Sequence, residues 1–147
     1  MTVRLPSTTR SLPIALMRAR EGVMPPIRDM LAESGITEQQ WRILRVLSEH
    51  GPQSSSILAE RACLLFPSLT RIAQKMEKNG LLVSSRDEQD RRRQTITITD
   101  AGKKIIDDNL GHAAEIVKGF KNKLGEENYE QLLDLLAKLD PQNREIK

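Results

Sequence analysis

A short segment near the middle of the chain carries polar side chains whose chemistry suits contact with nucleic-acid bases. The candidates in this segment are Pro67, Ser68, Thr70, Arg71, Gln74 and Lys75. When a helix lies in the DNA major groove, arginine pairs with guanine, glutamine pairs with adenine, and serine or threonine bonds bases or phosphates. An ordinary solvated helix face has a similar composition, so this segment alone does not establish DNA binding.

A second polar cluster follows in the segment 86–93, where basic and acidic side chains are mixed. Its candidates are Arg86, Asp90, Arg91 and Arg92. Arginines at the tip of a turn can enter a narrow, A·T-rich minor groove, which attracts positive charge. Asp90 lies two residues before Arg92, close enough to hold its guanidinium by a charge-assisted hydrogen bond. The alternative is a solvated turn whose charges pair among themselves with little gain in stability, but the presence of both clusters favours DNA.

The distribution of charge supports a basic binding surface in the centre of the chain. The net charge of the 147 residues is only +3, but residues 57–93 hold eight basic and five acidic side chains. Residues 94–147 instead hold eight basic and ten acidic ones. A localised basic segment is typical of a surface that faces phosphates. Many charge clusters are only solvated faces, so this pattern is supporting evidence.

The composition argues against several other classes of protein. No stretch of about 18 apolar residues predicts a membrane span, and residues 1–10 lack the apolar core of a secretory signal. The single Cys63 fits a reducing cytoplasm, and we expect it to lie in the core or beside a ligand. His50 and His112 lack metal-ligand spacing, and no phosphate loop or nucleophile motif is present. We therefore expect no cofactor, no metal and no enzymatic activity.

Apolar residues recur at helical spacing over most of the chain and predict a mainly α fold. The first long helix spans residues 11–34, and Pro25 and Pro26 predict a kink that interrupts it. Thr37 and Gln40 have the spacing of a capping box that begins a second helix. Further helices are expected at residues 54–62, 67–79 and 101–123 and, after Gly125, in a last helix that includes residues 132–139.

The period of the pattern changes after Gly80 and predicts one β-hairpin. Leu82 and Val83 begin the first strand, and residues 94–99 form the second, in which isoleucines alternate with threonines. The charged segment 86–93 then lies at the tip of the hairpin. Helix, turn, helix and hairpin in this order are typical of a winged helix-turn-helix.

Four segments of the chain resemble the MarR family of transcriptional regulators. They are the run from Leu64 to Arg71, the run from Met76 to Leu82, the triplet Asp90-Arg91-Arg92 and the run from Ile98 to Gly102. The triplet, followed by a strand, a threonine and a glycine, is the specific part. Similarity to the subgroup that represses homoprotocatechuate (4-hydroxyphenylacetate) degradation operons is carried by residues 15–21, 37–43 and 61–63. The resemblance covers residues 11–140, and the Pro25-Pro26 pair departs from the subgroup.

The resemblance implies a single domain over residues 1–147 with a winged helix-turn-helix at residues 37–99. It also implies long N- and C-terminal dimerisation helices, at residues 11–34 and 101–140. A two-fold homodimer of this kind would bind a pseudo-palindromic operator in double-stranded DNA, and an aromatic ligand would weaken that binding.

The apolar residues near the two ends of the chain support a dimer independently of the resemblance. Leu132, Leu136 and Leu139 form a stripe on the last helix, while Leu5 and Leu12 lie near the other end. A monomer of this size would have difficulty covering both. The alternative is that both ends pack within one subunit.

An arginine on the first helix is the leading candidate for binding a small acid. Arg20 lies on or beside the apolar stripe of that helix, where an unpaired charge is costly to bury. Its partner is either a carboxylate of the protein or, as in family members that bind aromatic acids through an arginine on this helix, the carboxylate of an effector. Trp41 could stack on an aromatic ring or simply pack in the core. Arg18 and Arg42 are weaker candidates, since Arg42 lies four residues after Glu38 and can pair with it.

Together these patterns predict a ligand-responsive transcriptional regulator, namely a repressor of an aromatic-acid catabolic operon that a phenolic carboxylate releases from DNA. Three alternatives stay open. They are a winged-helix module that binds protein, a small-molecule-binding protein whose DNA surface is vestigial, and a MarR-type regulator with a non-aromatic effector. Steeply salt-dependent binding to a palindromic duplex would separate a DNA-binding protein from the first two.

Overall fold

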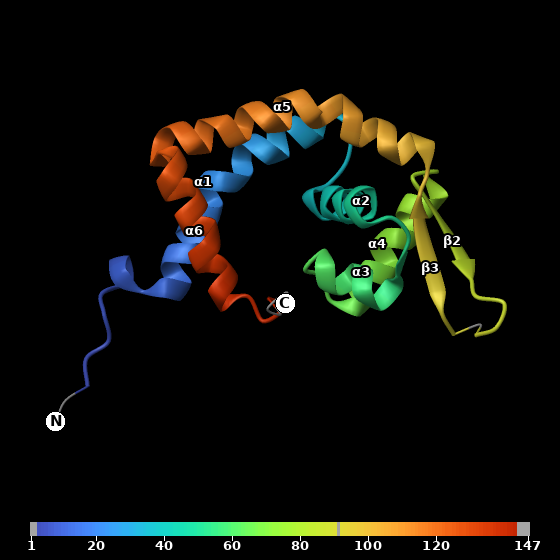
Figure 1. The fold of residues 1–147 in the computed structure, drawn as a ribbon, viewed down its shortest axis with the longest axis horizontal. Helices are drawn as coiled ribbons and strands as arrows, with labels where there is room; N and C mark the ends of the chain where they lie inside the picture. Colours follow the sequence, from blue (N-terminus) through green and yellow to red (C-terminus); the bar gives the residue numbers. More distant parts are fainter. Residues whose placement is uncertain (1–2, 91, 144–147) are drawn as a thin grey trace.

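The computed structural model describes residues 3–90 and 92–143, which form a mainly helical chain with a small sheet. In chain order the elements are η1 (Thr8–Arg10), α1 (Leu12–Glu33), α2 (Glu38–His50), β1 (Gln53–Ser54), α3 (Ser55–Arg61), α4 (Phe66–Lys78), β2 (Leu82–Arg86), β3 (Gln94–Ile98), α5 (Asp100–Leu124) and α6 (Glu126–Leu139). Figure 1 shows α5 with α1 beside it along one side of the molecule, while α2, α3, α4 and the strands gather at one end. The predicted mainly α fold with a winged helix-turn-helix is confirmed.

α1 is a single helix of 22 residues that passes through Pro25 and Pro26. The prediction that these prolines interrupt the helix is therefore wrong, while the kink expected at them stays a prediction. A proline inside a helix removes a backbone donor and crowds the preceding turn, but packing holds the helical path on both sides of the pair. Met24 is buried just before the prolines, and Met30 and Leu31 are almost completely buried after them. Burial of one face, rather than intrinsic propensity, supplies most of the stability of a helix in a folded protein.

The group formed by α2, α3 and α4 is built around one aliphatic core. The Thr37 hydroxyl accepts the N–H of Gln40 at 3.1 Å, and the Gln40 side chain accepts the N–H of Thr37 at 3.0 Å, which confirms the predicted capping box. The most deeply buried side chains of these helices are Ile43, Leu44, Leu47, Leu58, Leu69 and Met76. Complete burial of such a side chain contributes about 1.5–3 kcal/mol. The shared core therefore fixes the orientation of α4 relative to α2 and α3.

The predicted hairpin is present, and a third strand extends it. β2 and β3 are antiparallel, with Ser84 opposite Ile96. β1 pairs with the other edge of β3 through Gln53 and Ser54, so the strand order is β1-β3-β2. β1 has only two residues, too few to show an alternating pattern, and the sequence therefore does not predict it.

α5 begins against this group, where its Ile106 joins the same core, and then extends away from it (Figure 1), and both α5 and α6 leave large apolar side chains exposed. Thr99 caps α5 by accepting the N–H of Gly102 at 3.2 Å, and α5 packs along α1. α6 follows Gly125 and turns back from the far end of α5 (Figure 1). The exposed leucines of α1, α5 and α6 are Leu12, Leu16, Leu110, Leu124, Leu132, Leu133, Leu135 and Leu139. None of the helices in the described part of the chain combines the length and the apolar character needed to cross a membrane.

Gly102, at the start of α5, is a position where one added carbon atom should destabilise the fold. A Cβ atom there would lie 2.6 Å from the carbonyl oxygen of Leu81 and 2.7 Å from Cγ1 of Ile98. The Leu81 oxygen is held in place because it accepts the N–H of Thr99 at 3.1 Å. We expect Gly102→Ala to lower the free energy of unfolding by about 1–3 kcal/mol, the usual cost of overpacking. Urea unfolding followed by circular dichroism measures the change.

The matched control is Gly111→Ala on the same helix, where a Cβ atom would meet nothing within 4 Å. Replacing an exposed helical glycine with alanine should raise the free energy of unfolding by about 0.5–1 kcal/mol. Equal urea midpoints for Gly102→Ala and the unmodified protein would show that the start of α5 does not pack as closely against Leu81 as the structure indicates.

Candidate functional site

α4 presents the predicted base-contacting residues on an accessible face. Leu69, Ala73 and Met76 are buried in the core, so the opposite face of the helix points away from it. The candidates Pro67, Arg71, Gln74 and Lys75 are exposed, and Ser68 and Thr70 are half-buried. Thr70 Oγ1 donates to the carbonyl of Phe66 at 3.1 Å, so this hydroxyl proton is already used within the helix. The face still offers two cations and an amide, the groups that pair with guanine and adenine in a major groove.

The hairpin of β2 and β3 forms the wing and ends in a charged turn, where Arg86 and Arg92 are exposed. Asp90 Oδ1 accepts the backbone N–H of Arg92 at 3.1 Å, and the Asp90 carbonyl accepts the N–H of Arg93 at 2.9 Å. The prediction that this carboxylate holds the Arg92 guanidinium is therefore wrong, because the backbone N–H two residues on takes the bond, as is common for aspartate in turns. Asp90 thus shapes the turn itself. Arg91, also a candidate, lies outside the described residues.

α4 and the wing lie side by side (Figure 1). The small hollow between them is lined by Thr70, Gln74 and Glu77 of α4 and by Ser84 and Gln94 of the strands. Thr70 and Gln74 are themselves candidate base-contacting residues. The helix and the arginine-bearing hairpin therefore belong to one surface, as the sequence predicts.

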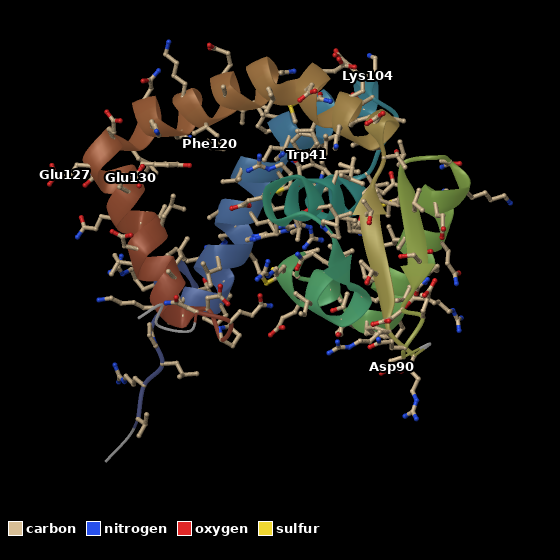
Figure 2. The ribbon with its side chains drawn as sticks, turned by 45° about the vertical axis from the view of Figure 1, so that its right-hand side comes forward. Trp41, Asp90, Lys104, Phe120, Glu127 and Glu130 are labelled. Atoms are coloured by element: carbon tan, nitrogen blue, oxygen red, sulfur yellow. The ribbon has the colours of Figure 1, made fainter. Side chains whose placement is uncertain are left out.

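A larger hollow lies between α1, α2 and α5 and has a volume of about 600 Å³, enough for a small aromatic molecule. Figure 2 shows the side chains of Trp41 and Phe120 on the side of α5 that faces α1 and α2. The residues that line the hollow are Ile27, Met30, Trp41, Arg45, Leu110, Ala113, Ala114, Ile116, Val117, Lys118, Phe120 and Lys121. Among the described residues, its lining includes cations and no carboxylate. The hollow therefore suits an anion with an aromatic ring.

Arg45 is a residue of this hollow that the sequence pattern misses. The helical pattern of α2 groups it with Glu38 and Arg42 on a polar stripe, which marks it as solvated. It lies four residues after Trp41, however, and side chains at that spacing are neighbours on a helix surface. Both line the hollow. The spacing to the only tryptophan is the signal that would have identified Arg45.

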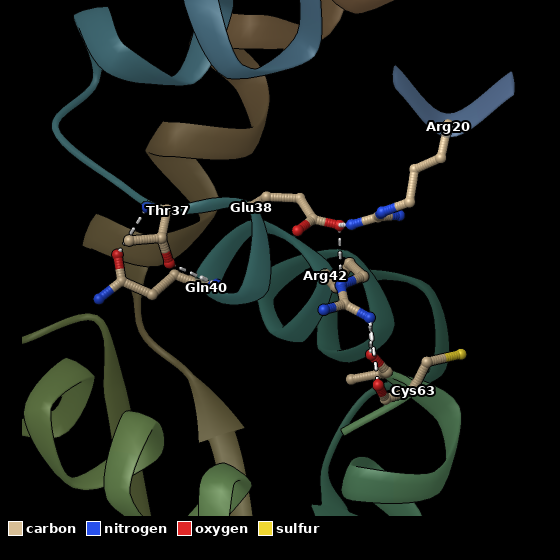
Figure 3. A network of polar contacts seen from close by, with 7 residues as sticks. Arg20, Thr37, Glu38, Gln40, Arg42 and Cys63 are labelled. Carbon is tan, nitrogen blue, oxygen red and sulfur yellow. Dashed lines mark hydrogen bonds and ion pairs between the residues drawn. The ribbon is translucent and has the colours of Figure 1, made fainter. Parts of the chain in front are cut away.

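Two of the predicted effector-binding arginines meet at a carboxylate of the protein. Arg20 Nη2 of α1 lies 2.9 Å from Glu38 Oε1 of α2, and Arg42 Nε lies 3.4 Å from the same oxygen (Figure 3). Arg42 Nη1 also donates to the carbonyls of Ala62 at 2.8 Å and Cys63 at 3.2 Å. Of the two partners considered for Arg20, the structure therefore shows a carboxylate of the same chain. Arg42 pairs with Glu38 four residues earlier, as its spacing predicts.

The structure of one subunit does not bring Arg20 and Trp41 into the same hollow. Arg20 lines a separate one with Arg28, Ile36 and Thr37. Trp41 is half-buried and packs against the core while also lining the larger hollow, so both of its predicted roles are compatible with its position. Arg18 is exposed on α1.

Cys63 is exposed in the turn between α3 and α4, so of its two expected places the core is wrong, and a place beside a ligand stays a prediction. Its φ of 56° is in the left-handed region, and the N–H of Leu64 returns to the carbonyl of Ala59 at 2.9 Å. This geometry ends α3 in the way that glycine usually ends a helix. Within residues 3–90 and 92–143, no group of three or more His, Cys, Asp and Glu side chains is placed to hold a metal ion.

Comparison with known proteins identifies the family. The sequence pattern of the MarR family matches residues 36–93. The HTH-type transcriptional regulator FarR of Neisseria gonorrhoeae is 40% identical over 129 residues, which cover 88% of each protein. The chain belongs to the MarR family. Another MarR-type relative, the homoprotocatechuate degradative operon repressor of Escherichia coli, is 36% identical over 126 residues, 86% of this chain and 85% of the relative.

Solved structures agree with the MarR assignment. NadR in complex with 4-hydroxyphenylacetate is 37% identical and superposes with a TM-score of 0.81, covering 95% of this chain and 99% of NadR. The transcriptional regulator PA4135 is 34% identical with a TM-score of 0.84, covering 91% and 98%. The relatives are transcriptional regulators and not enzymes, which confirms that the chain is a regulator without catalytic function.

Proposed function

We propose that this MarR protein is a homodimeric repressor that binds a pseudo-palindromic operator and leaves it when a phenolic carboxylate binds. The observation that carries the proposal is the single accessible surface formed by the polar face of α4 and the wing. An α-helix fits the major groove, and an arginine-bearing hairpin beside it fits the adjacent minor groove. Such a protein acts where the DNA is, in the cytoplasm of a bacterial cell.

In this proposal α4 reads bases and the wing adds minor-groove contacts. The major-groove set is Ser68, Thr70, Arg71, Gln74 and Lys75, with Pro67 in the first turn of the helix. The minor-groove set is Arg86, Arg91 and Arg92, with Asp90 holding the turn that carries them. Two subunits present two such surfaces, so the half-sites lie about one helical turn apart.

The exposed leucines of α1 and α6 form the dimer interface in this proposal. Leu132 is 42% exposed and Leu139 is 57% exposed within the single chain. Packing of both ends within one subunit, the alternative to a dimer, therefore leaves these side chains uncovered. Clustered exposed leucines of this kind mark a surface that a partner buries.

The effector site in this proposal is the hollow that Trp41 and Arg45 share. A guanidinium binds a carboxylate through two parallel hydrogen bonds, and the rings of Trp41 and Phe120 offer stacking surfaces for a phenol. NadR, a relative at 37% identity, was crystallised with 4-hydroxyphenylacetate, and a second relative represses a homoprotocatechuate operon. Arg20 and Arg42 then serve to hold Glu38, with Arg18 outside the site. The ligand acts by binding more tightly to a dimer whose two α4 helices are misplaced for successive grooves.

Arg45→Ala tests the proposed effector site. An operator is first selected from random duplexes with the unmodified protein, and its release by 4-hydroxyphenylacetate or 3,4-dihydroxyphenylacetate is followed by gel shift. We expect Arg45→Ala to bind the operator as before but to need at least about tenfold more acid for release, because one charge-assisted pair is lost. Thermal shifts with each acid report binding independently of DNA.

Arg20→Ala is the matched control, since it removes the same charge from the neighbouring hollow. We expect it to keep the response to the acid. Loss of the response in Arg20→Ala together with an intact response in Arg45→Ala would place the effector carboxylate on α1 and refute the proposed site.

A further inference from the structure

Glu77 joins the last turn of α4 to the first strand of the wing. Its Oε1 accepts the backbone N–H of Ser84 at 3.0 Å, and Ser84 Oγ lies 2.8 Å from both of its oxygens. Ser84 is in the middle of β2, opposite Ile96 of β3. The contact therefore links α4 directly to the hairpin, in addition to the turn at Gly80 that connects the two in the chain.

Two electrostatic effects oppose a carboxylate at this position. Glu77 lines the same hollow as Thr70 and Gln74, so it lies beside side chains that face DNA in the proposed function, where phosphates repel negative charge. It also lies in the last turn of α4, the end of a helix at which the helix dipole places partial negative charge. Lys75 and Lys78 in that turn have the favourable sign, and Glu77 has the unfavourable one. Its hydrogen bonds to Ser84 offset this cost.

Several other contacts hold the base of the wing or β3, among them Ser55 Oγ of α3, which donates to Gln94 Oε1 at 3.5 Å. Thr99 Oγ1 donates to the Gly80 carbonyl at 2.6 Å, and the Thr99 N–H donates to the Leu81 carbonyl, so the residues just before β2 are fixed. β1 pairs with the opposite edge of the sheet through Gln53 and Ser54. Glu77 contacts the wing from α4 itself, at a residue farther along β2 than the contacts of Thr99, and this bond limits movement of the hairpin relative to the helix.

We infer that Glu77 is a positioning residue for DNA recognition. It sets the angle between α4 and the wing, so that Arg92 reaches the minor groove while α4 occupies the major groove. This inference rests on the proposed DNA-binding function. It assigns a positioning role to a carboxylate whose own charge repels DNA. The nearby carboxylate thus increases specific binding although its charge alone would weaken binding to any DNA.

The sign of the change in DNA affinity distinguishes a positioning role of Glu77 from an effect of its charge alone. If Glu77 acted only through its charge, Glu77→Ala and Glu77→Gln would both tighten binding to the operator and to unrelated DNA alike. We expect Glu77→Ala instead to weaken operator binding by about tenfold, the effect of losing hydrogen bonds to a charged group, while binding to unrelated DNA does not weaken. Glu77→Gln keeps an oxygen that accepts the Ser84 N–H and should recover part of the loss. Glu60→Ala, which removes an exposed acid from α3, is the control for net charge.

A double-mutant cycle with Arg92→Ala tests whether Glu77 acts through the wing. Arg92→Ala should weaken operator binding in the unmodified protein and weaken it less in Glu77→Ala, because the wing is already displaced there. Equal effects of Arg92→Ala in both backgrounds, or tighter operator binding by Glu77→Ala, would overturn the inference. Thermal unfolding confirms that each variant is folded. Failure of the unmodified protein to bind any selected operator would instead refute the proposed function.

Discussion

Aspartate in place of Leu132 and Leu139 should convert the protein to a monomer and lower operator affinity by about a hundredfold to ten-thousandfold, the advantage that a second linked half-site provides. Both leucines are on α6, and about half of each side chain is exposed in the single chain. Their replacement therefore leaves the fold of one subunit intact, but it buries charges wherever a partner covers α6, which is very costly. Sedimentation equilibrium gives the mass, and gel shift on the selected operator gives the affinity.

Gln131→Asp on the exposed surface of the same helix adds a charge without removing a leucine, and this variant should remain dimeric. Two outcomes would contradict the dimer interface proposed for α6. One is a Leu132→Asp, Leu139→Asp variant that is still dimeric at micromolar concentration. The other is a monomeric variant that binds the full operator as tightly as the unmodified protein.

Arg71→Ala should have the second largest effect, on both the strength and the specificity of DNA binding. Arg71 is exposed on the face of α4 opposite the buried Leu69, Ala73 and Met76, where a guanidinium can reach a guanine in the major groove. Loss of such a contact costs about 1–3 kcal/mol per copy, and a dimer carries two copies. We expect weaker operator binding and a relaxed base preference at one position of each half-site, measured by repeating the selection with the variant.

Arg28→Ala removes the same charge from α1, away from α4 and the wing, and serves as the control. It should leave the base preference unchanged. If the two variants lose equal affinity and select the same operator, Arg71 contributes only through net charge, and the proposed major-groove contact is wrong.

The elements that carry the DNA-binding surface could be predicted from the sequence because their patterns are strong and local. Leu69, Ala73 and Met76 repeat at helical spacing in α4, and the alternation of isoleucine and threonine in β3 has a period of two. The capping box at Thr37 is likewise a signal contained within four residues. These are the features for which local chemistry and tertiary packing favour the same structure.

The features that the sequence did not predict depend on packing between distant segments. Pro25 and Pro26 stay helical because buried methionines and a leucine hold α1 on both sides of them. β1 exists only because β3 offers it an edge. The need of Arg20 for an anion could be predicted, but its partner Glu38 is 18 positions away, and only the fold brings the two together.

The geometry of single turns accounts for the two remaining differences between the prediction and the structure. The Asp90 carboxylate accepts the backbone N–H of Arg92 because this N–H is nearer to it than the guanidinium at the end of the Arg92 side chain. Cys63 is exposed in the turn that ends α3, where its backbone takes the left-handed conformation. Hydrophobic periodicity predicts neither feature, because it indicates which face of a helix or strand is buried and not the conformation of a single turn.

The most direct test of the central proposal is hydroxyl-radical and methylation footprinting of the unmodified protein on a selected operator. Two α4–wing surfaces on one duplex should protect guanines in two major-groove segments about one helical turn apart. Protected minor-groove sugars should flank them, and 4-hydroxyphenylacetate should remove both protections together. A single protected segment, equal protection of unrelated duplexes, or a footprint confined to one groove would contradict a dimer that reads DNA with α4 and the wing.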